Sequence, residues 1–391
     1  MDVVRLLLDR RLWGGAGPAC AVLLILANAY IARLERGFQE ERRANLLMMT
    51  NPAEGSVATS RYDWSVGEDP GRYWAQIPDA SQQPLVIVSG MSQMYAINDP
   101  QPGDEIIAEH LDDALSPHGV RAFGLAAPNM NNEEALLYFV ATSFQAQTRP
   151  TSFVYGVCFD KFRNVDLRPG LMGLLRERPG LRDAWSAVCA SRSIEYPMAC
   201  AKMRTALEDT PGNGPGPRED DVEHRLRARL GLVVPMIGDG PDLNAKAQLD
   251  IFLFRNWLFR IKATSKRPLL ESVYRLNQEF LGLMAEVAKE RSVTLVLYVI
   301  PLNPGADNPY VSEQYLAFKS WLQGFASDRG LPFANLEGVV PHEDWGLSNG
   351  EPDFKHFRER GHELVANAIL DRFGEILERA RPAVRDVGAD R

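Results

Sequence analysis

The body of the chain alternates short apolar runs with longer amphipathic stretches. The first run, at residues 84–89, reads Pro-Leu-Val-Ile-Val-Ser and is rich in β-branched side chains. Continuous apolar runs of this length are typical of strands in a parallel sheet with both faces covered. By the same pattern we predict further strands at residues 120–123, 151–159, 293–300 and 331–336.

Helical segments separate these predicted strands. Hydrophobic positions that recur every three or four residues indicate an amphipathic helix. This spacing predicts helices at residues 104–115, 132–145, 269–289, 313–329 and 357–373. Strands and helices that alternate in this way indicate an α/β fold, in which a parallel sheet lies between two layers of helices.

Residues 160–265 interrupt the alternation. Helical patterns near residues 170–190 and 195–208 precede a tract rich in glycine and proline at 211–217. We predict a mostly helical insertion here. The expected organisation is a membrane anchor or signal segment at 1–43, an irregular lead-in at 44–83, an α/β domain at 84–378 interrupted at about 160–265, and a flexible tail at 379–391.

The N-terminal segment indicates where the protein works. Residues 12–32 contain no charged side chain, and Arg5, Arg10 and Arg11 precede them. Because a helix of about 20 residues spans a bilayer, we predict a single-pass anchor with the rest of the chain outside the cytoplasm. A cleavable signal peptide that ends at Ala27-Asn28-Ala29 is a second interpretation, and it implies the same compartment. A buried core helix is the third.

Composition excludes several classes of protein. The chain has 391 residues, of which 45% are hydrophobic and 24% charged, as in ordinary globular proteins. A net charge of −8 gives no attraction to phosphate backbones, so we expect no nucleic-acid partner. The four cysteines form no Cys-x-x-Cys pair, which disfavours a structural zinc site. Cys189 and Cys200 are close enough in sequence to pair in an oxidising compartment, or both are free thiols.

Candidate chemistry follows from the expected sheet, because open parallel sheets bind ligands at the carboxyl ends of their strands. Gly90-Met91-Ser92 follows the first strand, and a serine needs a base, most often histidine, to become a nucleophile. Among six histidines, His356 has Asp353 three residues before it, where we expect a loop to meet the last helix. We predict Ser92 as nucleophile, His356 as base and Asp353 as the carboxylate that orients the imidazole. A capping serine and a structural histidine are the alternatives.

These blocks resemble the SGNH hydrolase superfamily, in which a serine follows the first strand and an Asp-x-x-His block precedes the final helix. Gly361 stands five residues after His356, as the family pattern expects, and the resemblance covers roughly residues 84–159 and 269–375. The family's Gly-Asp-Ser appears here as Gly90-Met91-Ser92. That variation is similar to membrane-anchored members such as the D-alanyl transfer protein of lipoteichoic acid modification and the alginate O-acetylation proteins. The resemblance implies an SGNH-like, flavodoxin-like sheet sandwiched by helices, and neither metal nor cofactor.

The resemblance also implies donors for an oxyanion. The family uses a backbone N–H after the second strand, and Ala127 is the best match to it. After the third strand the family places an asparagine, but residues 156–160 contain none. Asn129, Asn131 and Asn132 are the alternatives.

Two functions follow. The first is a membrane-anchored, extracytoplasmic serine esterase or O-acyltransferase that acts on acyl groups of a cell-surface or secreted polysaccharide. By resemblance, its partners are an acylated glycan or acyl donor and a membrane-bound O-acyltransferase. The second is a catalytically inactive SGNH-like scaffold or glycan-binding protein in a polysaccharide modification or export complex, which the missing aspartate and asparagine favour. A nucleotide site is disfavoured because the first strand-to-helix turn lacks a glycine-rich phosphate loop.

Overall fold

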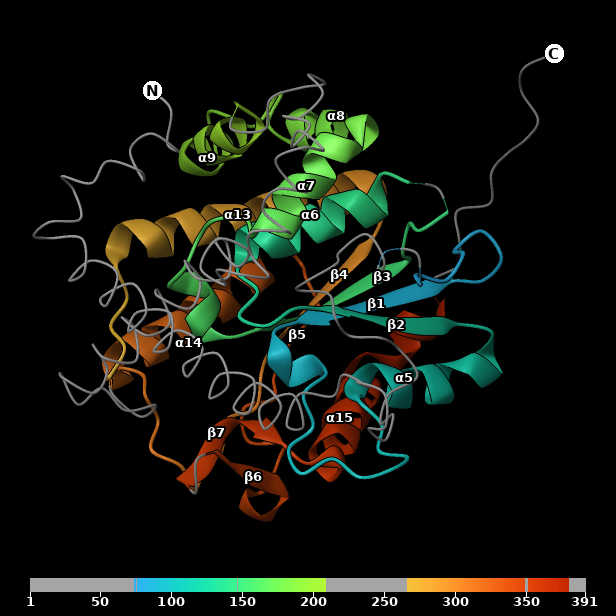
Figure 1. Ribbon diagram of the computed structural model, residues 1–391, viewed down its shortest axis with the longest axis vertical. Coiled ribbons are helices and arrows are strands. Elements are labelled where there is room, and N and C mark those ends of the chain that lie inside the picture. Colours follow the sequence, from blue (N-terminus) through green and yellow to red (C-terminus); the bar gives the residue numbers. More distant parts are fainter. Residues whose placement is uncertain (1–73, 75, 146, 209–265, 349–350, 380–391) are drawn as a thin grey trace, which may run out of the picture. The chain divides into compact units, whose positions relative to one another are not determined.

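The computed structural model describes residue 74 and residues 76–145, 147–208, 266–348 and 351–379 (Figure 1). They belong to one compact unit made of Leu47–Asn213 and Thr264–Arg391. The predicted anchor at residues 1–43, most of the lead-in, the insertion after residue 208 and most of the tail lie outside the described residues. In the part of the chain that is described, no helix has the length and apolar character needed to cross a membrane.

The centre of the unit is a five-stranded parallel sheet. Its strands are β1 (Leu85–Gly90), β2 (Arg121–Ala126), β3 (Ser152–Val157), β4 (Thr294–Val299) and β5 (Phe333–Asn335). They lie side by side in the order β2-β1-β3-β4-β5, which is the order of flavodoxin-like doubly wound sheets. Every residue of β1 and β3 is buried, as expected for strands covered on both faces. The predicted α/β fold with a parallel sheet is therefore confirmed.

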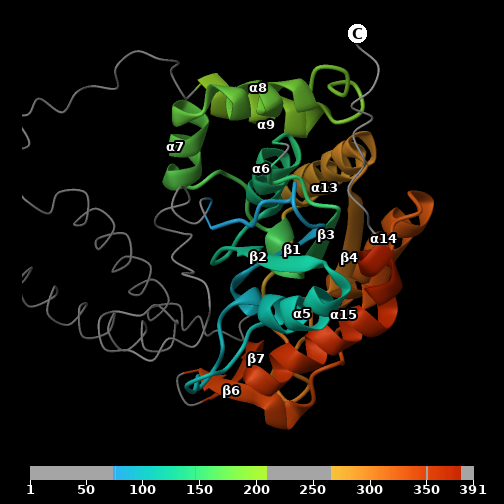
Figure 2. The ribbon, with the colours of Figure 1, turned by 90° about the vertical axis from the view of Figure 1, so that its right-hand side faces the viewer.

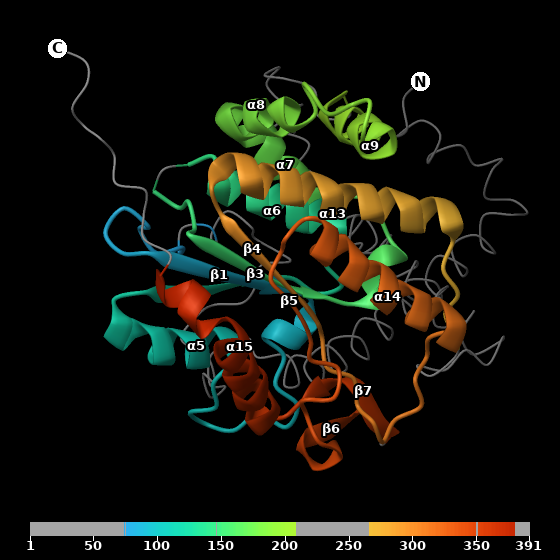
Figure 3. The ribbon, with the colours of Figure 1, turned by 180° about the vertical axis from the view of Figure 1, so that it is seen from behind.

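Helices cover both faces of the sheet (Figures 1 and 3). Helices α5 (Ile107–Leu115) and α15 (Glu359–Arg379) lie on one face, and α6 (Asn132–Ser143) and α13 (Glu271–Arg291) lie on the other. Helix α14 (Ser312–Asp328) joins α13 through the rings of Trp321 and Tyr274, whose centroids are 5.9 Å apart. All twelve residues of α6 are buried, because a second helical layer covers its outer side.

That second layer is the described part of the insertion. It consists of α7 (Pro169–Glu177), α8 (Pro179–Val188) and α9 (Pro197–Glu208), which match the predicted helical segments near 170–190 and 195–208. Each begins with proline, whose missing N–H has no role in a first helical turn. Figure 2 shows α8 and α9 above α6 and α13.

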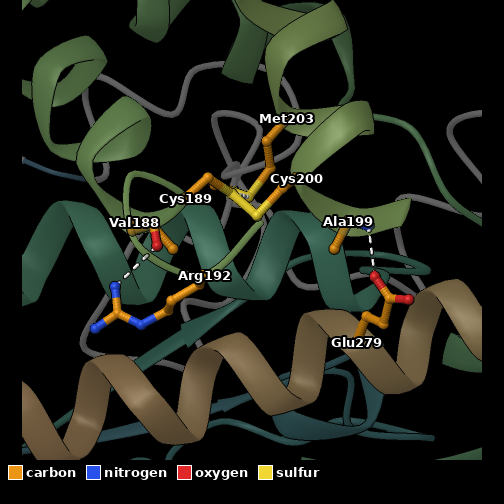
Figure 4. Close-up of a disulfide and its surroundings, with 7 residues drawn as sticks. All are labelled: Val188, Cys189, Arg192, Ala199, Cys200, Met203 and Glu279. Carbon is orange, nitrogen blue, oxygen red and sulfur yellow. Dashed lines mark hydrogen bonds between the residues drawn. A yellow bond between two sulfur atoms is a disulfide. The ribbon is translucent and has the colours of Figure 1, made fainter. Parts of the chain in front are cut away.

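A disulfide joins the turn after α8 to helix α9 (Figure 4). It links Cys189 to Cys200, so the pairing left open by the sequence is present in the structure. Beside it, the Ala199 amide donates to Glu279 Oε2 at 2.8 Å, which fastens α9 to α13. The free cysteine among the described residues is Cys158, which is buried.

A β-hairpin precedes the last helix where we expected a loop. Strand β6 (Trp345–Ser348) pairs antiparallel with β7 (Glu351–Phe357), and helix α15 begins at Glu359 rather than at Phe357. The expected helix start was therefore two residues early, because Phe357 is opposite Trp345 in the hairpin. The sequence does carry a signal for it, since the Asn-Gly dipeptide between the strands favours two-residue hairpin turns.

Candidate active site

Ser92 lies just past the carboxyl end of β1, at the edge of the sheet where ligands bind. Strand β1 ends at Gly90, and a Cβ there would stand 2.5 Å from Cγ of Met94. Glycine thus leaves room for the short 3-10 turn Ser92–Met94 to fold back on the strand. Ser92 is the first residue of that turn and is 4% exposed.

The structure brings Ser92, His356 and Asp353 together across 264 residues of sequence. Ser92 Oγ lies 2.8 Å from His356 Nε2, and His356 Nδ1 lies 2.9 Å from Asp353 Oδ2. The carboxylate can only accept a hydrogen bond, so Nδ1 carries the proton and Nε2 is free to accept from the serine hydroxyl. This is the geometry in which a histidine takes the proton of an attacking serine.

Asp353 is held as a carboxylate. Its Oδ1 accepts the backbone N–H groups of Lys355 and His356 at 2.9 and 3.2 Å. Burial raises its pKa, but the hydrogen bond and charge of His356 and the two amide bonds outweigh burial, so the pKa of Asp353 lies below its usual value. An ionised Asp353 orients the imidazole and stabilises the imidazolium.

The same side chain explains how residues 353 and 356 meet on one strand. In a regular strand, positions three apart point to opposite faces. The ladder between β6 and β7 is irregular here, because Trp345 is opposite Phe357 whereas Leu347 is opposite Pro352. Asp353 and His356 lie between Pro352 and Phe357, in the part of β7 that is outside this ladder. There the Asp353 side chain bends the backbone by accepting the N–H groups of residues 355 and 356.

The glycine at the fifth position after His356 has a packing role. A Cβ on Gly361 would stand 2.7 Å from Cβ of Phe357, the residue next to His356. The ring of His362 also packs against Phe357, with centroids 4.6 Å apart. Burial lowers the pKa of His362 to about 3, so this histidine stays neutral where it packs against Phe357 of β7.

Ala127 occupies the position expected of a backbone donor. Strand β2 continues to Ala126, beyond the predicted end at residue 123, and Ala126 is opposite Gly90 of β1. Ala127 is therefore the first residue after β2, at the same edge of the sheet as Ser92, and it is fully buried. Asn129, one of the alternative donors, is exposed and has a left-handed φ of 50°.

The other two asparagines are engaged in the fold. Asn131 caps helix α6 and donates to the carbonyl of Asp166 at 2.7 Å. Asn132 accepts from the Tyr155 hydroxyl at 2.7 Å and donates to Asn277 at 3.1 Å. Each Nδ2 thus donates to another part of the fold, and both side chains are buried.

The carboxyl end of β3, where the family resemblance expects an asparagine, carries Cys158 instead. Its sulfur contacts that of Met91, the residue before Ser92, at 2.7 Å. Burial, aided by the charge of Asp160, raises the pKa of the Cys158 thiol to about 11. Cys158 is therefore a neutral packing group beside Met91.

Two further residues hold the site, and the sequence pattern does not predict either. Gln93 donates from Nε2 to the carbonyl of Pro301 at 2.8 Å, and Asn303 donates from Nδ2 to the carbonyl of Asp353 at 2.8 Å. The only available signal is position, since Asn303 follows β4 at the same sheet edge that singled out Ser92. Within the described ranges, no group of three or more His, Cys, Asp or Glu side chains could hold a metal ion.

Comparisons with known proteins add little to this geometry. No protein-family model matches the chain, and no curated protein matches it. Among solved structures, a candidate acylhydrolase from Bacteroides fragilis is 11% identical with a TM-score of 0.37, covering 81% of this chain and 100% of that one. A GDSL-like lipase from Bacteroides thetaiotaomicron is 10% identical with a TM-score of 0.36, covering 79% of this chain and 97% of that one.

Proposed function

We propose that the protein is a serine-dependent, SGNH-type acyl-ester hydrolase or O-acyltransferase. The observation that carries the proposal is the continuous relay from Ser92 through His356 to Asp353, at the carboxyl edge of a sheet of flavodoxin-like order. Nucleophile, base and orienting carboxylate are within hydrogen-bond reach of one another, which is the arrangement that acyl transfer requires.

The reaction proceeds in two halves. Ser92 Oγ attacks the acyl carbonyl while His356 Nε2 takes its proton, and the resulting imidazolium is stabilised by Asp353. His356 then gives the proton to the departing alcohol oxygen, which leaves an acyl-Ser92 ester. Water or a sugar hydroxyl attacks that ester and loses its proton to His356, and His356 returns the proton to Ser92 Oγ as the acid or the acylated sugar leaves.

For the setting, we propose an extracytoplasmic site anchored by residues 1–43, with acyl groups of a cell-surface or secreted polysaccharide as substrate. The Cys189–Cys200 disulfide supports an oxidising compartment. The polysaccharide, and a membrane-bound O-acyltransferase that supplies the acyl group, rest on the family resemblance.

An inactive scaffold or glycan-binding protein is the second candidate. The observation that favours it is Cys158, which stands at the end of β3 where an amide donor is expected and whose thiol is a weak donor. A scaffold of this kind would keep the triad geometry without activating Ser92.

A labelling experiment separates the two candidates. We expect a fluorophosphonate probe to label wild-type protein and wild type to hydrolyse p-nitrophenyl acetate. Ser92→Ala should abolish labelling and lower turnover about a thousandfold or more. Ser89→Ala is the matched control, because Ser89 is a buried serine of β1, three residues before Ser92, and its Oγ has no hydrogen-bond partner within the described residues. Wild type that neither reacts nor turns over would favour the scaffold.

Double variants test whether the three residues act as one unit. Once His356→Ala has left the serine unactivated, adding Ser92→Ala should cost little more. Asp353→Asn should be milder than His356→Ala, since the histidine remains but its preferred tautomer is lost. Fully additive losses on ester hydrolysis would mean that Ser92 and His356 do not share a mechanism.

A further inference from the structure

The part of β7 that carries the triad is fastened to the end of β4 by Asn303. Its backbone N–H donates to the carbonyl of Phe354 at 3.1 Å, and its side-chain Nδ2 donates to the carbonyl of Asp353 at 2.8 Å. These carbonyls lie where β7 has left its ladder with β6, between Pro352 and Phe357. Asn303 thus serves as their strand partner, and at 5% exposure it does so with little competition from water.

The orientation of the Asn303 amide is fixed by its surroundings. Its Oδ1 accepts the backbone N–H of Gly305 at 2.8 Å and lies 2.9 Å from His342 Nδ1. The Gly305 amide can only donate and the Asp353 carbonyl can only accept, so the oxygen and nitrogen of Asn303 cannot be exchanged. His342 must then donate from Nδ1, and the amide is held on both sides.

The same loop also contacts the nucleophile's half of the site. Gln93 follows Ser92 directly, is 1% exposed, and donates to the carbonyl of Pro301 at 2.8 Å. The loop at residues 301–303 therefore contacts both halves of the site. Pro301 accepts from Gln93, the residue after Ser92, and Asn303 donates to Asp353.

We propose that Asn303 is a positioning residue, which sets the placement of the Asp353–His356 pair relative to Ser92. The inference rests on the proposed function, because it assigns Asn303 a part in the same acyl transfer. Without the side-chain amide, the buried carbonyl of Asp353 loses its partner and the unpaired stretch of β7 relaxes. A displacement of the base of about 1 Å costs on the order of a hundredfold in rate.

Asn308 provides a matched control in the same loop. Both asparagines close a turn by accepting the N–H two residues ahead, Asn303 from Gly305 and Asn308 from Tyr310, at 2.8 and 2.9 Å. Both also line a cavity of about 230 Å³ in this loop. Within the described residues, Asn303 and not Asn308 donates to the carbonyl of Asp353. Serine keeps the turn, because its hydroxyl also accepts such an N–H, but it is too short to reach the Asp353 carbonyl as well.

We expect Asn303→Ser to lower kcat for p-nitrophenyl acetate by about 10- to 100-fold with little change in KM. The acid limb of its pH–rate profile should also move to lower pH, because a loosely held carboxylate stabilises the imidazolium less. Asn308→Ser should change neither. A purely structural role would reduce the active fraction without moving the acid limb, and identical kinetics of the two variants would overturn the proposal.

Two further measurements keep the proposal falsifiable. If Asn303→Ser does not fold, His342→Ala replaces it: His342 is exposed, and its loss frees one side of the Asn303 amide. It should move the acid limb in the same direction but less, and an unmoved limb overturns the proposal. If wild type proves inactive, the proposed function fails. Imidazole titration of His356 by NMR in the Ser92→Ala background then decides the positioning: a lower midpoint with Asn303→Ser than with Asn308→Ser supports it, and equal midpoints refute it.

Discussion

Lys161 is an unusual residue in this fold, because its amine is buried and forms no ion pair with any residue that the structure describes. The residue is 1% exposed, and within the described residues its Nζ has no hydrogen-bond partner. The ammonium lies 3.9 Å from the centroid of the Tyr155 ring, a contact that compensates only in part for lost water. Burial lowers the pKa of Lys161 to about 7 from 10.5, so folding favours its neutral form.

This shift predicts a pH-dependent stability. Between pH 7 and 10.5 the unfolded chain binds the Lys161 proton and the folded chain releases it, so this group makes stability rise with pH. One proton gives a slope of at most about 1.4 kcal/mol per pH unit. Lys161→Met should therefore stabilise the protein most near pH 7 and progressively less toward pH 9.

Urea unfolding of wild type and variant at pH 7, 8 and 9 measures the effect. Lys289→Met is the control, because Lys289 is an exposed lysine in the last turn of α13 and its replacement should leave the slope unchanged. A constant difference between Lys161→Met and wild type across this range would contradict the depressed pKa.

The sequence indicates the residues of the candidate site to which we assign chemical roles, but not those that hold them in place. Ser92 and the Asp353–His356 pair can be predicted because serine needs a base and strand ends meet at one sheet edge. The role of Asn303 depends on two carbonyls that are free only because β7 leaves its ladder. Such a role follows from tertiary contacts, and an asparagine between prolines looks like an ordinary turn residue.

At the scale of elements, strands were the most predictable part, since their buried faces demand continuous apolar runs. Predicted and observed strands differ by a few residues at their ends, as for the third strand, predicted at 151–159 and observed as Ser152–Val157. The hairpin of β6 and β7 was not predicted although an Asn-Gly dipeptide lies between its strands, because β6 is only four residues long and three of them pair in an irregular ladder. Helix α6 has little amphipathic pattern, because all of its sides are buried.

From the disulfide between α8 and α9 we can predict how much stability the fold gains in an oxidising compartment. Cys189 and Cys200 are separated by 11 residues, and closing a loop of this size stabilises a fold by about 2–3 kcal/mol. The double variant Cys189→Ser/Cys200→Ser should lose about that much, and dithiothreitol should lower the Tm of wild type similarly.

The double-serine variant is its own control for the reductant, whose addition should not change its Tm. Labelling of Ser92 should survive in folded double variant, because the disulfide joins α8 to α9 on the outer side of α6, away from the triad. A wild-type Tm that is insensitive to reductant would show that the bond does not form.

At the scale of the whole molecule, we expect the candidate site and the N-terminal segment to have separate roles. Ser92, His356, Asp353 and Asn303 all lie within one compact unit, so we expect the proposed acyl-ester chemistry to persist without residues 1–43. What those residues would add is location, since a polysaccharide outside the cytoplasm is reached only by an exported or anchored enzyme. Removing them should therefore change where the protein is found without changing what it does.

We expect the full chain to fractionate with membranes and a chain that begins at Asn45 to be soluble and labelled by fluorophosphonate at the same rate. The reason is the uncharged run at residues 12–32, which is just long enough to span a bilayer.

Leu24→Arg places a charge in that run at a cost of about 2.5–3.5 kcal/mol and should weaken insertion, whereas Leu24→Ile should not. Mass spectrometry of the mature N-terminus separates an anchor from a signal peptide, because cleavage after Ala29 would leave a soluble exported protein. An intact N-terminus on a cytosolic protein would contradict both, and would leave the buried core helix as the interpretation of this segment.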